Sequence, residues 1–372
     1  MNTIIYSGKT NHIDPNFIYI TECDIPHVTL LTIDGKRYMY IKGAHSNQDT
    51  LQCFQSQKLS RSELISMINQ TNDVFFSLAN LPTHPEWNAM KHVAINTTQL
   101  PSQIKQKRLI KDKHEIKLIR QACLHTCNAM KYMIQQCKPG MTQVQLSTLF
   151  MDYLQTKQIY DVSFPNIVAH GSDCKTLHHK PKQKKITSGS LVLVDVGCKY
   201  KHYCSDLSRC FPISGSFTKE QSTMYDILLR TFNHGLSMIQ PGASFQDITK
   251  STVLTLFDEC VQIQLLNPTD NESEKLHIMN HCMPHSLGHH LGLETHDCEL
   301  PIEILEPNMI ITLEPGFYFN SIHHPLINQS VWNQYKFIGG LRIEDTLLIT
   351  EQGCKNLTPI TKKKETLLSW IG

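Results

Sequence analysis

The stretch from Cys282 to Glu344 decides how the rest of this chain is interpreted. It opens with Met283-Pro284-His285-Ser286-Leu287-Gly288-His289-His290, passes through Glu294-Thr295-His296-Asp297, reaches Thr312-Leu313-Glu314-Pro315-Gly316, and closes on Gly339-Gly340-Leu341-Arg342-Ile343-Glu344-Asp345. Imidazoles, carboxylates and a guanidinium set among apolar residues would destabilise a folded chain unless they are paired. A metal ion is the partner that best suits such carboxylates and imidazoles.

Two further acids in the same apolar setting lie upstream. Asp195 stands in Leu191-Val192-Leu193-Val194-Asp195-Val196-Gly197, and Asp206 begins Asp206-Leu207-Ser208-Arg209. The polar residues between them have the character of a hairpin connection, so we expect both acids on adjacent antiparallel strands. Cross-strand Cβ atoms lie about 5 Å apart. Two carboxylates at that distance repel each other unless a cation lies between them.

A repeated order of elements predicts two related halves. In each half a helix ends at a Pro-Gly pair, a Thr or Ser can cap a second helix, and an apolar strand follows that carries one acid before a glycine. In the first half these are the helix 113–137, Pro139-Gly140, the cap Thr142 and the acid Asp195. In the second half they are the helix 220–238, Pro241-Gly242, the cap Ser244 and the acid Glu314. If the halves pack face to face, acids from both strands meet at the seam between them.

Together with one imidazole, the acids in apolar strands form an oxygen-rich set of ligands. These acids are Asp195, Asp206, Glu314 and Glu344. Such a set suits Mn²⁺, Co²⁺ or Fe²⁺, and also Zn²⁺, better than a thiolate site would. Because four anions need more than one divalent charge, two ions about 3.5–4 Å apart with a bridging hydroxide fit the count.

The histidines do not form a zinc-peptidase helix. His285 and His289 have the spacing of the H-E-x-x-H motif, but Ser286 occupies the place of its glutamate. We assign His281 and His290 to ordinary polar packing.

Composition narrows the class of protein. The chain has 372 residues, enough for two domains, and a formal net charge of +2, which gives no reason to expect nucleic acid or a membrane surface as a partner. Its 13 cysteines are an odd number and form no CxxC pair. Together with a start that does not resemble a signal peptide, they predict a reducing, cytoplasmic compartment.

Residues 1–107 are predicted to form a small mixed domain that acts as a scaffold or lid. Asp34-Gly35 is a hairpin signal between two strands, and the polar residues 99–108 are interpreted as a connector. The predicted strands are Phe17–Thr21, Val28–Ile33, Lys36–Ile41 and Val74–Leu78.

In their order along the chain, these motifs resemble the proline-specific branch of the pita-bread metallopeptidases, aminopeptidase P and prolidase. The resemblance runs from about Arg108 to Thr350 and rests on Val194-Asp195, Ser205 to Arg209, Phe211-Pro212, Pro284-His285, Leu291-Gly292-Leu293, His296-Asp297, Glu314-Pro315-Gly316 and Arg342-Ile343-Glu344-Asp345. It implies an α+β protein. A C-terminal pita-bread (creatinase/aminopeptidase) domain of two pseudo-symmetric halves, residues 108–372, would follow a small mixed α/β N-terminal domain.

The resemblance also assigns roles to residues. It makes Asp206 and Glu344 bridging ligands in a dinuclear site whose ligands are Asp195, Asp206, His289, Glu314 and Glu344. Glu314 would also take the proton from the metal-bound water, and His296 would stabilise the tetrahedral intermediate. His285 and His178 would be pocket histidines near the proline, and Arg342 would lie beside the metal strand.

The implied activity is metal-dependent exopeptidase cleavage of the Xaa-Pro bond in small peptides with proline second, with Mn²⁺ as the expected ion. Ser286 replaces a usual glycine and His179 a common aromatic, departures that concern substrate fit rather than catalysis. The residues between Glu314 and Glu344 leave the choice between Xaa-Pro aminopeptidase and Xaa-Pro dipeptidase open. A methionine aminopeptidase-like enzyme would share the ligands, but the N-terminal domain and the Arg342 strand disfavour it. A non-catalytic binding module should have lost ligands, and none is missing. A homodimer is permitted but not required.

Overall fold

A computed structural model describes residues 2–6, 8–9, 12–21, 28–33, 36–41, 57–69, 74–76, 95–96 and 99–371. The chain divides into two compact units, Met1–Leu109 and Ile110–Gly372. The sequence placed this boundary between residues 107 and 108. Of the helices in the described ranges, none combines the length and the apolar character that crossing a bilayer requires.

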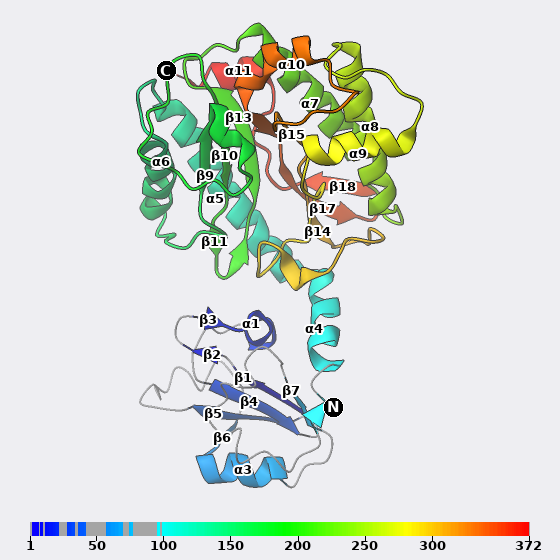
Figure 1. The fold of residues 1–372 in the computed structure, drawn as a ribbon. Helices are drawn as coiled ribbons and strands as arrows, with labels where there is room; N and C mark the ends of the chain where they lie inside the picture. Colours follow the sequence, from blue (N-terminus) through cyan, green and yellow to red (C-terminus); the bar gives the residue numbers. More distant parts are fainter. Residues whose placement is uncertain are drawn as a thin grey trace. The chain divides into compact units, whose positions relative to one another are not determined.

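The first unit contains a sheet with the strand order β6-β5-β4-β1-β7-β8 (Figure 1). The strands are β1 (Asn2–Tyr6), β4 (Val28–Ile33), β5 (Lys36–Ile41), β6 (Gln57–Lys58), β7 (Val74–Phe76) and β8 (Ile95–Asn96), and a second pair is β2 (Gly8–Lys9) and β3 (His12–Ile13). The helices are α1 (Pro15–Thr21), α3 (Arg61–Asn69) and α4 (Gln99–Leu109). The predicted strands at 28–33 and 36–41 are confirmed as an antiparallel pair. The turn Asp34-Gly35 and the end of the predicted strand at 77–78 lie outside the described residues.

One prediction for this unit, the strand at 17–21, was wrong. Residues 17–21 belong to helix α1, because Asp14 accepts a hydrogen bond from the main-chain N–H of Asn16 (2.8 Å) and Pro15 starts the helix. The connector 99–108 is also helical, and its Arg108 is buried with Nη1 donating to Asn16 Oδ1 (2.9 Å). The helix at 15–21 was missed because local composition did not reveal the contact of Asp14 with Asn16.

The first half of the second unit packs two helices beside a three-stranded sheet of order β13-β10-β9. Its elements are α5 (Lys113–Gln136), α6 (Gln143–Thr156), β9 (Ile167–His170), the short helix η3 (Gly171–Lys175), β10 (Leu191–Val196), β11 (Lys199–Tyr200), β12 (Tyr203–Cys204) and β13 (Leu207–Pro212). Capping boxes at Asp112 and Thr142 start the two helices, which confirms the predicted cap at Thr142.

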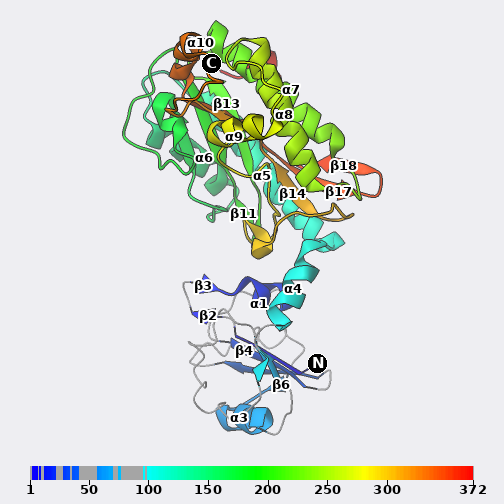
Figure 2. The same cartoon turned by 45° about the vertical axis from the view of Figure 1, so that its right-hand side comes forward.

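The second half repeats this plan around strands of order β14-β17-β18 and the pair β15-β16. Its elements are α7 (Lys219–Met238), α8 (Phe245–Gln262), α9 (Glu272–Cys282), η4 (Asp297–Glu299), β14 (Ile310–Leu313), β15 (Gly316–Tyr318), α10 (Gln329–Tyr335), η5 (Lys336–Ile338), β16 (Gly340–Arg342), β17 (Asp345–Thr350), β18 (Gly353–Asn356) and α11 (Lys364–Leu368). Ser244 caps α8, as predicted. In both views the pair α7 and α8 lies on the side of the strands opposite to α6 (Figures 1 and 2).

The two halves repeat each other in hydrogen bonds as well as in element order. The N–H of Gly140 donates to Ile186 O (2.8 Å), and the N–H of Gly242 donates to Leu305 O (2.7 Å). Both glycines have a positive φ, +89° and +82°, which a side chain would strain. These paired bonds support the predicted internal repeat. At the seam, β13 of the first half packs against β16 and β17 of the second.

Candidate metal centre

The five predicted ligands come from separate elements and line one cavity. Asp195 lies on β10, Asp206 just before β13, and His289 in the loop after α9. Glu314 directly follows β14, and Glu344 lies between β16 and β17. The cavity has a volume of ≈ 590 Å³, and all five residues are in its wall.

Strands β10 and β13 are adjacent and antiparallel, as expected, but the two aspartates do not face each other across the ladder. Asp195 pairs with Ser208, and Asp206 lies two residues earlier, outside the strand. Its carboxylate reaches His289 of the second half, with Oδ2 3.5 Å from Nε2, and still interacts with the charge of Asp195.

The ligand atoms are close enough to share an ion. His289 Nε2 lies 3.5 Å from Asp206 Oδ2 and 3.5 Å from Glu314 Oε1. One ligand atom from each of Asp206, His289 and Glu344 falls within a mutual distance of 4.8 Å. Three separate segments, one from the first half and two from the second, therefore place possible metal-ligand atoms close together.

The carboxylates fit a divalent cation. Asp195 Oδ1 and Asp206 Oδ1 are buried and have no hydrogen-bond partner among the described residues. Burial, and then the neighbouring charges of Asp195 and Glu314, raise the pKa of Asp206 well above its usual value. Burial and the charge of Asp206 do the same to the pKa of Glu344. A bound cation would offset this repulsion and use the unpartnered oxygens.

Neighbouring groups orient the ligands. The Nδ1–H of His289 donates to the carbonyl of His290 (3.0 Å), so its Nε2 lone pair points at the acids. Thr312 Oγ1 donates to Glu314 Oε1 (3.2 Å) and accepts from the main-chain N–H of His289 (3.0 Å). Ser208 Oγ donates to Glu344 Oε2 (2.8 Å). The sequence did not single out Thr312 or Ser208, although each stands two residues from a ligand.

Arg342 joins the metal ligands to the pocket. Its Nη2 donates to Asp195 Oδ2 (2.6 Å), its Nε to Ser208 Oγ (2.9 Å), and its Nη1 to the hydroxyl of Tyr318. The Tyr318 hydroxyl in turn lies 3.1 Å from His285 Nε2. A Cβ on Gly316 would come within 2.9 Å of that nitrogen, so only glycine fits there. Tyr318 is a site residue that the sequence did not single out.

The two predicted pocket histidines, His178 and His285, also line the cavity, and so does His296, the predicted donor to the tetrahedral intermediate. The ring of His296 lies 4.3 Å from the ring of His289, and burial lowers the pKa of His296. His285 is held between the Ser286 carbonyl, 2.8 Å from Nδ1, and Tyr318, and burial lowers its pKa too. His178 is exposed at the cavity wall.

The histidines that we assigned to polar packing lie elsewhere. His290 is buried behind the cavity, which agrees with that assignment. His281 is exposed, and its ring meets that of His277 on α9.

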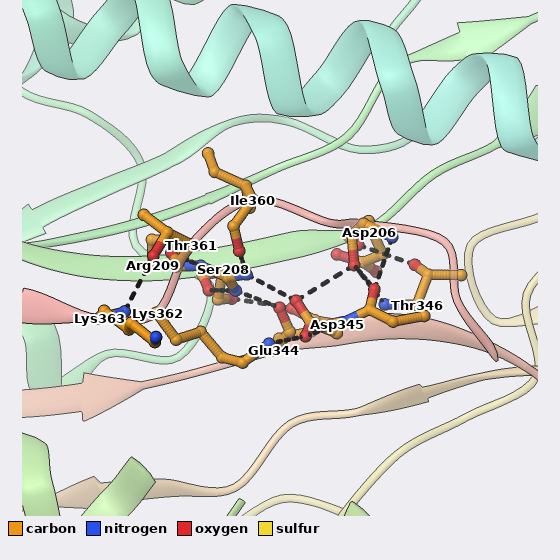
Figure 3. A network of polar contacts seen from close by, with 12 residues as sticks. Asp206, Ser208, Arg209, Glu344, Asp345, Thr346, Ile360, Thr361, Lys362 and Lys363 are labelled. Atoms are coloured by element: carbon orange, nitrogen blue, oxygen red, sulfur yellow. Dashed lines mark hydrogen bonds and ion pairs between the residues drawn. The ribbon is translucent and has the colours of Figure 1, made fainter. Parts of the chain in front are cut away.

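A buried arginine ties together the main chains that carry Asp206 and Glu344 (Figure 3). Arg209 is fully buried, and its Nη1 donates to the carbonyls of Ser208 (2.9 Å) and Glu344 (2.6 Å). Its Nη2 donates to Asp345 Oδ1 (2.6 Å) and to the carbonyl of Ile360 (2.8 Å). Because β13 and β17 belong to different halves, this one side chain crosses the seam.

The comparisons with known proteins agree with this geometry. A family model described as metallopeptidase family M24 matches residues 117–351. The Xaa-Pro aminopeptidase of Escherichia coli strain K12 is 33% identical over 265 residues, 70% of this chain and 58% of that protein. A probable Xaa-Pro aminopeptidase of Phaeosphaeria nodorum is 32% identical over 303 residues, 74% of this chain and 38% of that protein. This chain thus spans less than two thirds of either relative.

Among solved structures, a low-pH form of aminopeptidase P from E. coli has a TM-score of 0.88 and 25% identity, covering 100% of this chain and 93% of that one. A zinc-substituted form of the E. coli enzyme with product has a TM-score of 0.83 and 24% identity, with the same coverage. The match in family and the acid–imidazole cluster indicate a divalent metal as the cofactor. The chain therefore belongs to metallopeptidase family M24, and its fold is the pita-bread fold of aminopeptidase P.

Proposed function

We propose that this protein is a metallo-exopeptidase that cleaves the Xaa-Pro bond of small peptides with proline second. The observation that carries the proposal is the cavity whose wall combines four carboxylates and His289 with four further histidines. The names of the relatives, Xaa-Pro aminopeptidases, support the same reaction.

We assign Asp195, Asp206, His289, Glu314 and Glu344 as the ligands of two divalent ions, and Mn²⁺ as the native metal, because the donor set is rich in oxygen. When bound, the ions would polarise the scissile carbonyl and lower the pKa of water. Co²⁺, Fe²⁺ and Zn²⁺ suit the same donors.

Residues of the cavity can supply the base, the donor to the oxyanion and the positioning group that the reaction also needs. Glu314 is the proposed base: its carboxylate takes the proton of the attacking water and passes it to the leaving nitrogen of proline. His296 is the proposed donor to the oxyanion, because it lines the cavity with its ring 4.3 Å from the ring of His289. Arg342 is the proposed positioning residue, since it holds Asp195 by a bond of 2.6 Å.

Proline itself explains why a special pocket is useful. A peptide bond to proline has no N–H, so an enzyme that grips an extended backbone loses a hydrogen bond there. His285 and His178, placed in the cavity wall, are the proposed contacts for the ring. The Ser286 carbonyl can only accept, so the proton of His285 lies on Nδ1 and its Nε2 accepts from the Tyr318 hydroxyl. With both nitrogens engaged, His285 would offer a ring face to proline.

The proposal is tested by turnover of an Xaa-Pro dipeptide and an Xaa-Pro-Xaa tripeptide before and after chelation. We expect hydrolysis that a chelator abolishes and Mn²⁺ or Co²⁺ restores. Undiminished activity of a metal-free sample would refute the metal dependence. Cleavage of Met-Ala-type peptides in preference to both substrates would instead favour a methionine aminopeptidase-like enzyme, and metal binding without any hydrolysis would favour a binding module.

Three further assignments belong to the same proposal. No disulfide joins two cysteines of the described ranges, which supports a reducing compartment such as the cytoplasm. Residues 1–107 would serve as a scaffold or lid. A homodimer is the assembly to test, by light scattering of the purified chain.

A further inference from the structure

A buried glutamine, Gln143, is hydrogen-bonded to the segment 170–182, part of which lines the cavity. Gln143 is the first residue of α6, and its side chain is fully buried. Its Nε2 lies 3.0 Å from His170 Nδ1 and 2.8 Å from Asp173 Oδ2. Its Oε1 lies 2.9 Å from His179 Nε2 and 2.9 Å from the main-chain N of Lys182. The amide thus uses both donors and both acceptor sites.

The partners determine which way this amide faces. The main-chain N–H of Lys182 can only donate, so the atom it meets must be Oε1. The Nε2 group then faces the Asp173 carboxylate, which accepts. It follows that His170 Nδ1 accepts and carries no proton, whereas His179 Nε2 donates. The orientation of one side chain therefore sets the proton positions on two rings.

The internal repeat shows that the equivalent position can hold an apolar residue. Phe245 of α8 occupies the place of Gln143 in the second half: both follow the cap, and both main-chain N–H groups bond to a matching loop, Gln143 to Lys184 O (3.2 Å) and Phe245 to Glu303 O (2.8 Å). The second half thus fills this position with an apolar ring. In the first half, the side chain of Gln143 at this position makes four hydrogen bonds.

All four bonds end on residues 170–182. Within that segment, Leu177, His178, His179 and Lys180 line the cavity. His178 is exposed at the wall, while the next residue, His179, is buried against Gln143. The bond to His179 therefore fixes the main chain immediately beside His178.

We propose that Gln143 is a positioning residue that holds the His178 segment against the substrate, and so sets affinity for the proline side of the peptide. This inference rests on the proposed function. Gln143 does not line the cavity, so it would act only through the segment it binds.

The test compares Gln143→Met with Gln145→Met. Gln145 lies on the same helix and bonds to the N-cap residue Thr142, but it is exposed and outside the cavity wall. We expect Gln143→Met to raise KM for Xaa-Pro substrates, and Kd for the product-like dipeptide Pro-Leu, by about tenfold. That factor corresponds to losing about one hydrogen bond's worth of contact between the His178 segment and the peptide. Turnover and metal content should change little. Gln145→Met should match the wild type.

A double-mutant cycle tests whether Gln143→Met raises KM through His178. In a His178→Ala background, Gln143→Met should raise KM no further. An equal rise in both backgrounds, or an unchanged Kd for Pro-Leu, would overturn the inference while leaving the proposed function intact. A wild-type protein that neither binds Pro-Leu nor cleaves Xaa-Pro peptides would refute both.

A milder variant covers the case in which Gln143→Met does not fold. His179→Phe keeps a ring in place and removes only the bond to Oε1, which Lys182 continues to satisfy. We expect a smaller rise in KM that is again absent beside His178→Ala. An unchanged KM in His179→Phe would count against the inference.

Discussion

Glu314 is placed by its neighbours as well as by its strand. Its Oε1 accepts from Thr312 and lies 3.5 Å from His289, and its Oε2 lies 3.8 Å from His285 Nδ1. We predict that Glu314→Gln folds but loses most activity. The amide keeps the volume of the side chain but removes both a negatively charged metal ligand and the proposed base. General acid–base catalysis alone is worth about 10²–10⁴-fold. Wild-type turnover in this variant, measured at saturating metal, would show that another residue is the base.

His296 and His289 lie ring to ring, yet we expect opposite results when each is replaced. His296→Ala should fold and keep its metal and KM, while turnover falls by about 10²–10³-fold, since a donor to the oxyanion acts only in the transition state. His289→Ala should lose metal. Metal analysis and steady-state kinetics of both variants separate the roles. A metal-depleted His296→Ala would make His296 a ligand, and a less stable but active one would make it a packing residue.

At the scale of elements, the segment 170–182 should make the protein sensitive to acid. Burial lowers the pKa values of His170 and His179 from 6.5, so the folded chain binds fewer protons than the unfolded chain below that pH. Their contribution to stability is present above pH 6.5 and is lost as the pH falls through the lowered values.

We therefore predict that the melting temperature falls on acidification below pH 6.5, and that His179→Phe, which has one titrating ring fewer, shows a shallower fall. Thermal denaturation across pH 5 to 8 provides the measurement. Parallel curves for the two proteins would show that His179 does not contribute.

At the scale of the whole molecule, Asp345 holds the seam between the halves. It accepts from Arg209 and Lys362, and also from Thr358 and Asn356 (Figure 3 shows Asp345 with Arg209 and Lys362). We predict that Asp345→Asn destabilises the unit Ile110–Gly372 by about 3–5 kcal/mol, because the fully buried Arg209 loses its countercharge.

Denaturant unfolding measures that loss, with Lys250→Met as the control. Lys250 pairs with Glu272 at 2.7 Å on the surface, where both side chains are about half exposed. Breaking an exposed pair costs about 0–1 kcal/mol. Equal losses in the two variants would mean that the buried network does not hold the seam.

Much of the catalytic unit could be predicted locally. The Pro-Gly stops and the caps Thr142 and Ser244 act within one helical turn, so they are visible in sequence order. The acids were recognised because a carboxylate inside an apolar strand is costly without a partner. The errors came where a segment's state depends on distant contacts, as for the helix at 15–21, which Asp14 caps and Asn16 ties to Arg108.

By itself the sequence predicted the repeated halves and the four acids, because spacing and apolar setting are properties of order along the chain. The resemblance to the pita-bread metallopeptidases added His289 as a ligand and the pocket histidines as expectations. Only the tertiary structure decided which partners those residues have. Arg342 bonds Asp195 across 147 positions, and Gln143 bonds His179 across 36. Hydrogen bonds act over about 3 Å in space whatever the separation in sequence, so Tyr318, Arg209 and Gln143 were recognised only once the chain was folded.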